Sequence, residues 1–122
     1  MQETQVFTPA RPQGVAQPVL AAALTNAVVL IAAQQASLES VSAYNGAAAA
    51  PVYIQVFDAA NVAAVTLGTT KPKYIFPMGQ ASPLNLAQLN LNFANGICVA
   101  ATTTATGNSA PGTAPDAAFG VR

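Results

Sequence analysis

The chain has 122 residues, enough for one domain with a single modest hydrophobic core. Four basic and four acidic residues give a net charge of zero, and 7% of the residues are charged. A soluble domain of ordinary composition is about 25% charged, which would be about thirty residues here. The balance of charge argues against nucleic-acid or membrane-surface binding. The scarcity of charge predicts a surface that associates with other chains, with an Ala-rich monomer as the alternative.

Residues 1–18 are predicted to form an extended N-terminal arm, because Pro9, Pro12, Gly14 and Pro18 oppose regular structure. The arm is expected to bind another chain, with folding back onto its own domain as the alternative. Phe7 is the expected anchor, since an aromatic ring buries the most area per ordered residue. The predicted partner-binding residues of the arm are Val6, Phe7, Pro9, Arg11, Pro12 and Val15.

Residues 19–122 are predicted to form a β-sandwich domain. Its first part, Val19–Ala33, is too short and too interrupted for a membrane span. An export signal is the alternative, since Arg11 precedes this apolar run, although Pro9, Pro12 and Pro18 oppose it. Within this run, Ala27–Ala33 is predicted to be a buried strand, and Leu20–Leu24 a possible helical turn. Leu38–Tyr44 is the next predicted strand and ends at the turn-forming pair Asn45-Gly46.

The clearest strand is Val52–Asp58, in which Val52, Ile54 and Val56 alternate with Tyr53, Gln55 and Phe57. In Leu84–Phe93 the alternation changes phase near Ala87-Gln88, which indicates a β-bulge or a strand that changes sheets. The other predicted strands are Val62–Leu67, Lys73–Phe76, Ile97–Thr106 and Phe119–Arg122. This spacing predicts an all-β, antiparallel, jelly-roll-like sandwich, with residues 107–118 as a loop before the last strand.

Groups that could perform catalysis or bind a metal are scarce. The chain contains no His, and its one cysteine, Cys98, is expected to be buried and inert. Glu39 and Asp58 are expected to face solvent or to cap loops rather than to act as a catalytic pair. Lys71 and Lys73 form the one basic cluster and are expected to be solvated, although contact with an acidic partner or nucleic acid is the alternative. We therefore predict no enzyme activity, no catalytic residue, no cofactor and no metal.

Several segments between about residues 50 and 106 resemble the small β-sandwich virion structural proteins of tailed bacteriophages. They include a paired strand that ends in a turn, a glycine-containing loop, an apolar strand ending in Pro and Gly, and the last paired strands. These segments are Val52–Ala59, Val65–Pro72, Tyr74–Gly79, Leu89–Phe93 and Asn95–Ala100. The resemblance covers about half of the chain, whereas residues 1–18 and Val19–Ala33 fit it poorly.

The resemblance implies a structural component of the virion and carries over no catalytic residue. Within the virion it favours a capsid cement (decoration) protein on the capsid surface, which binds between capsomers. The expected partners are copies of itself, as a trimer, and the major capsid protein or another virion protein, with no nucleic acid and no membrane. A tail, neck or baseplate component is the alternative, and a carbohydrate-binding or adhesion module is a further one.

Overall fold

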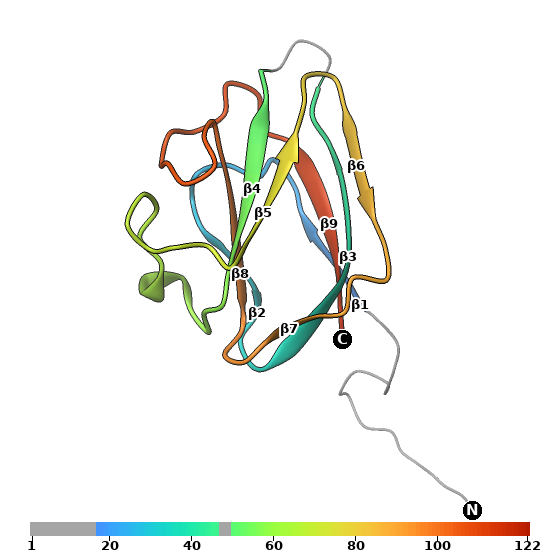
Figure 1. The fold of residues 1–122 in the computed structure, drawn as a ribbon, viewed down its shortest axis with the longest axis vertical. Helices are drawn as coiled ribbons and strands as arrows, with labels where there is room; N and C mark the ends of the chain where they lie inside the picture. The colour runs from blue at the N-terminus through green and yellow to red at the C-terminus, as the bar shows by residue number, and fades with distance from the viewer. Residues whose placement is uncertain (1–16, 47–49) are drawn as a thin grey trace, which may run out of the picture.

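Figure 1 shows the computed structural model of the chain, which describes residues 17–46 and 50–122. Nine β-strands and one short 3-10 helix form the regular structure of these residues. The strands are β1 (Gln17–Ala21), β2 (Val29–Ala32), β3 (Ala36–Tyr44), β4 (Val52–Phe57), β5 (Tyr74–Met78), β6 (Pro83–Leu86), β7 (Leu91–Phe93), β8 (Ile97–Thr102) and β9 (Asp116–Val121). Within the described part of the chain, no helix has the length and apolar character needed to cross a membrane.

The strands form two antiparallel sheets that pack face to face, which confirms the predicted sandwich. One sheet has the order β1-β9-β3-β6, with β7 also paired to β3, and the other has the order β2-β8-β4-β5. These pairings include a nested series, in which the outermost strands of the chain pair with each other and the inner ones likewise: β1 with β9, β2 with β8, β3 with β6 and β7, and β4 with β5. In Figure 1 the first strand (blue) therefore lies beside the last (red). This nested pairing is that of a jelly roll.

Strand β4 is an interior strand, as predicted, because it pairs with β8 on one side and β5 on the other. Val52, Ile54 and Val56 face the core between the sheets. Phe57, on the opposite face, is also buried, in a second apolar cluster with Ala59, Val65 and Cys98. The segment after β4 thus covers the outer face of this sheet. This cover explains why alternating side chains on both faces of β4 are buried.

The strand predicted at Val62–Leu67 is wrong. Val62–Ala64 is a 3-10 helix, and the Asn61 side chain accepts a hydrogen bond from the backbone N–H of Ala64 at 3.1 Å. A polar side chain that bonds to its own backbone in this way competes with strand pairing. The apolar composition of the run indicated burial, and Val65 is buried, but the local cap selects a turn.

The predicted strand Leu84–Phe93 is two strands, β6 and β7, which both pair with β3. Between them Gln88 and Asn90 have positive φ angles of 57° and 51°, which a continuous strand does not permit. The backbone N–H of Leu89 donates to the carbonyl of Glu39 at 2.9 Å. The change of phase is therefore a break between two strands of one sheet, and neither the predicted β-bulge nor the predicted change of sheet is correct.

The boundaries at both ends also differ from those predicted. Gln17 is the first residue that the structure describes and already belongs to β1, so Pro18 lies in a strand, opposite Gly120. β1 is an edge strand, where the missing N–H of a proline costs no ladder bond. The helical turn considered at Leu20–Leu24 is wrong, since β1 continues to Ala21. The last strand begins at Asp116, three residues before Phe119, and lies between β1 and β3.

Candidate functional site

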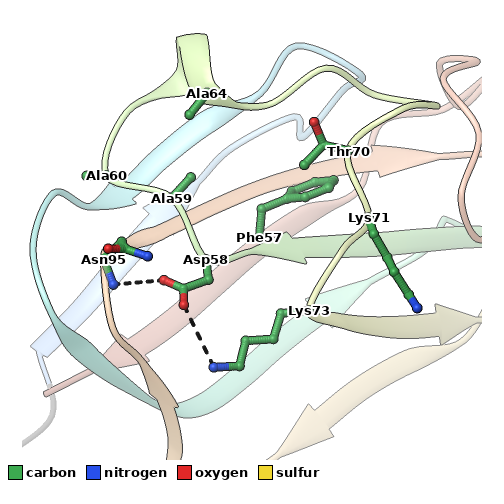
Figure 2. Close-up of a pocket in the computed structure, with 9 residues that line it drawn as sticks. All are labelled: Phe57, Asp58, Ala59, Ala60, Ala64, Thr70, Lys71, Lys73 and Asn95. Atoms are coloured by element: carbon green, nitrogen blue, oxygen red, sulfur yellow. Dashed lines mark hydrogen bonds and ion pairs between the residues drawn. The ribbon is translucent and has the colours of Figure 1, made fainter.

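A hollow with a volume of about 450 Å³ lies where β4 ends and β5 begins. Asp58 follows β4 directly, and Lys73 immediately precedes β5. Figure 2 shows both side chains at one end of the pocket, with Ala59, Ala60 and Ala64 on its other side. The pocket therefore combines an apolar wall with two lysines and one carboxylate.

Asp58 binds the turn between β7 and β8. Its carboxylate accepts backbone hydrogen bonds from Asn95 at 2.8 Å, from Ala94 at 3.3 Å and from Gly96 at 3.4 Å. Burial alone would raise the pKa of Asp58, but these three N–H groups and Lys73 together lower it below its ordinary value of 3.8. Asp58 is thus ionised and caps a loop, which is one of the two roles expected for it.

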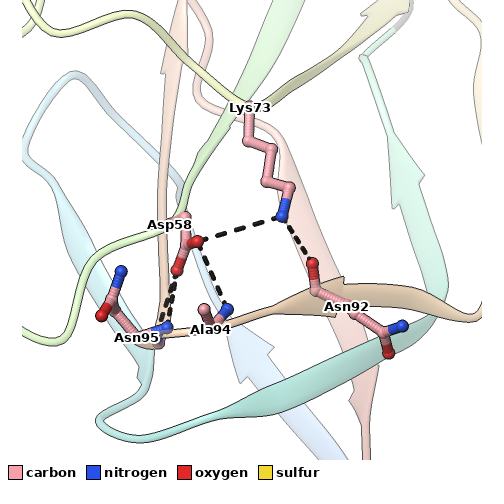
Figure 3. A network of polar contacts seen from close by, with 6 residues as sticks. Asp58, Lys73, Asn92, Ala94 and Asn95 are labelled. Carbon is pink, nitrogen blue, oxygen red and sulfur yellow. Dashed lines mark hydrogen bonds and ion pairs between the residues drawn. The ribbon is translucent and has the colours of Figure 1, made fainter.

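Lys73 joins the same turn from the other side. Its Nζ donates to the carbonyl oxygen of Asn92 at 2.7 Å and lies 3.9 Å from Oδ2 of Asp58 (Figure 3). It also lies 5.1 Å from the centre of the Phe93 ring. Lys71 is exposed and extends away from Asp58 in Figure 2. The basic pair is therefore divided: Lys73 connects the β4–β5 loop to β7, and Lys71 extends into solvent.

Close contact of backbones explains the glycine in this turn. A Cβ atom on Gly96 would lie 2.5 Å from the carbonyl oxygens of Ala32 and Ala59. Both atoms belong to the backbone and cannot rotate away. The pair Asn95-Gly96, predicted as a turn, thus packs against β2 and the end of β4 while Asp58 holds its N–H groups.

The other expected acidic residue, Glu39, belongs to a separate cluster in the first sheet. Its Oε2 accepts a hydrogen bond from Arg122 Nη2 at 3.2 Å and another from Ser37 Oγ. Glu39 and Asp58 therefore bind different partners. Among the described residues, no group of three or more His, Cys, Asp or Glu side chains is placed to hold a metal ion.

Cys98 is buried, as predicted, and its Sγ lies 3.5 Å from the carbonyl oxygen of Ala59. Burial raises the pKa of this thiol above its ordinary value. The thiolate is therefore disfavoured, which makes the side chain a poor nucleophile.

The predicted partner-binding residues of the arm lie outside the described residues. They are Val6, Phe7, Pro9, Arg11, Pro12 and Val15. What sequence reasoning missed is the exposure of apolar side chains just after the arm. Leu20 is 71% exposed, and Val29 and Leu30 in β2 are 36% and 40% exposed, although this strand was predicted to be buried. The sequence did contain one signal of this exposed apolar surface, because no charged residue lies between Arg11 and Glu39.

We compared the chain with protein-family models, with curated proteins and with solved structures, and none of the three comparisons gave a match.

Proposed function

We propose that the chain is a non-catalytic structural protein of a bacteriophage virion, and specifically a capsid cement protein that stabilises the head by binding between capsomers. The observation that carries the proposal is a surface suited to contact with other proteins. From Gln17 to Leu38 there is no charged residue, yet this stretch exposes Leu20, Val29 and Leu30. Exposed apolar side chains in a segment that contains no charged residue favour protein–protein contact.

The fold is compatible with this proposal. Jelly rolls occur in viral capsid domains, but also in lectins and other proteins, so this support is an analogy at the level of the fold. The segments between residues 50 and 106 resemble phage sandwich proteins, and this resemblance also favours a structural component of the virion. The partners in this proposal are copies of the chain, as a trimer, and the major capsid protein or another virion protein.

Electron cryomicroscopy of the particle that contains the chain tests the proposal. We expect density for the sandwich on the outer surface of the head, between capsomers, in a fixed number of copies per capsomer. Particles that lack the chain should regain this density, and resist heating better, when the purified protein is added. Density in the tail, neck or baseplate would refute the cement function and show that the chain is a structural component of that part of the virion. Absence from purified particles would refute both.

One surface favours carbohydrate binding as a second candidate. A shallow groove of about 330 Å³ crosses the first sheet and is lined in part by Leu20, Tyr44, Asn85 and Asp116. Tyr44 is 51% exposed and stands between Asp116 and Pro83 of the neighbouring strands. An exposed aromatic ring beside a carboxylate and an amide suits a sugar, which has apolar faces and hydroxyl edges. A glycan array with the wild-type chain and Tyr44→Ala tests this candidate: binding lost in the variant supports it, and no binding by either chain refutes it.

A further inference from the structure

The edges of the two sheets differ in how they are protected from pairing with another strand. The outermost strands are β1 and β6 in the first sheet and β2 and β5 in the second. Three of these four described strands contain a proline: Pro18 in β1, Pro83 in β6 and Pro77 in β5. Proline cannot donate a ladder hydrogen bond and is a common means of blocking an edge. The short strand β7 has its Asn92 carbonyl occupied by Lys73.

Strand β2 is the one outermost strand of the two described sheets without a proline. Its sequence, Val-Leu-Ile-Ala, contains neither a proline nor a charge. Val29 and Leu30 are opposite Val99 and Cys98 of β8, and the register shifts between Leu30 and Ala32. Because β2 is the last strand in its sheet, its other edge is unpaired within the described part of the chain. An apolar edge whose backbone groups are unpaired can accept a strand from another chain.

We propose that residues 2–8 of a second copy of the chain add as a strand to the free edge of β2. These residues contain neither Pro nor Gly and include Thr4, Val6, Phe7 and Thr8, all of which favour strands. Pro9 and Pro12 follow and exclude a longer regular strand. Residues 9–16 then provide a connection of up to about 28 Å to Gln17, where β1 begins.

A hollow next to β2 gives the added strand a place for one side chain. It has a volume of about 290 Å³ and lies between Val19 and Val121 of one sheet and Ile31 and Ala32 of the other. Gln17, the first residue that the structure describes, lines the same hollow. Because successive strand residues point to opposite faces, a strand that contains Val6 and Phe7 presents one of them to the hollow. An apolar side chain in this place would extend the core between the sheets.

The inference deepens the proposed function, on which it rests, by naming how copies of the chain contact each other. Cross-linking tests it in a Cys98→Ala background, which removes the native thiol. One preparation carries Val6→Cys, a second carries Leu30→Cys, and a control carries Asn85→Cys on β6. The first is mixed with the second or with the control and treated with a short bismaleimide. We expect a covalent dimer with Leu30→Cys at a yield at least tenfold above that with Asn85→Cys.

Equal yields with both partners, or no dimer, would overturn the proposal. A chain carrying both Val6→Cys and Leu30→Cys that cross-links only within itself would overturn it as well, since the segment would then fold back on its own domain.

A matched pair of charged variants gives a second test, without introduced cysteines or a cross-linker. Leu30→Lys places a charge on the unprotected edge, and Leu20→Lys places the same charge on the edge that contains Pro18. Both leucines are exposed, so both variants should fold. We expect sedimentation to show self-association weakened at least tenfold by Leu30→Lys and changed less than twofold by Leu20→Lys. Equal effects would contradict the proposal. Particle binding is measured separately, so a chain that pairs through β2 but is absent from particles would refute the proposed function alone.

Discussion

Replacing Asp58 by Ala should destabilise the domain by about 2 kcal/mol. The change removes the acceptor for three backbone N–H groups of the β7–β8 turn, of which the bond to Asn95, at 2.8 Å, is the shortest. One hydrogen bond to a charged group contributes about 1.5–3 kcal/mol. The other two bonds are long and the side chain is partly exposed, so water replaces much of what they lose. The ion pair with Lys73, at 3.9 Å and partly exposed, adds about 0–1 kcal/mol.

Urea unfolding followed by circular dichroism measures this loss. With a slope of about 2 kcal/mol per molar urea, the midpoint should fall by about 1 M at an unchanged slope. Lys73→Met is the control, because it removes the ion pair and the exposed hydrogen bond to the Asn92 carbonyl but leaves the three backbone bonds to Asp58. It should cost about 1 kcal/mol, since water can replace an exposed lysine at both acceptors. If the control destabilises the domain as much as Asp58→Ala does, the carboxylate is not what holds the turn.

The dependence on pH gives a separate check of the same reasoning. The pKa of Asp58 is lower in the folded protein than its ordinary value of 3.8. The unfolded chain therefore takes up the proton first as the pH falls. The stabilisation is fully present above about pH 4 to 5 and is lost as the pH falls through the folded pKa. Wild type and Asp58→Asn should thus converge in stability under acid conditions, and a difference that grows as the pH falls would contradict this account.

Three further changes test the packing around this site and the core. Gly96→Ala should cost at least about 1–3 kcal/mol, because its Cβ would meet two backbone carbonyl oxygens; a urea midpoint within error of wild type would contradict the close approach. Cys98 should react with a thiol reagent at least a hundredfold more slowly in the native protein than in 6 M guanidinium chloride, whereas rapid native labelling would show that the thiol is accessible. Phe119→Ala should cost about 3–5 kcal/mol in thermal or urea unfolding, since the ring is fully buried between the sheets, and a cost below about 1 kcal/mol would place it outside the core.

The local features of the fold could be predicted from the sequence. Alternation identified β4, because the side-chain period of a strand is two wherever the strand occurs. The pair Asn95-Gly96 marked a turn, and the turn lies between β7 and β8. For Asp58, placed at the end of a predicted strand, the sequence favoured either exposure to solvent or the capping of a loop. Its partners could not, since the residues that it binds are more than thirty positions away.

What depended on the arrangement of distant strands could not be predicted in this way. The apolar run at β2 suggested burial on both faces, but β2 is at the edge of its sheet, and only the pairing of the whole chain decides which strands are outermost. Pro18 suggested irregular backbone, but it lies in β1, which is also an edge strand. A proline is tolerated there, and the sequence around Pro18 does not reveal that β1 is at an edge. At Val62–Leu67 a local contact decided the structure instead: the Asn61 side chain caps a 3-10 helix at Val62–Ala64, although the apolar pattern predicted a strand.

The same scarcity of charge also limits how this protein can protect its sheet edges. Many proteins place lysines on such strands to prevent association, but this chain has two lysines, Lys71 and Lys73, and both precede β5. The described strands use proline for this purpose on three edges, which requires no charge. Proline blocks a ladder without making the surface more polar, so the faces beside it can still contact another protein. In the proposed assembly, proline limits which edges can pair while the surface stays weakly charged, and β2, the outermost described strand with neither proline nor charge, is where pairing should occur.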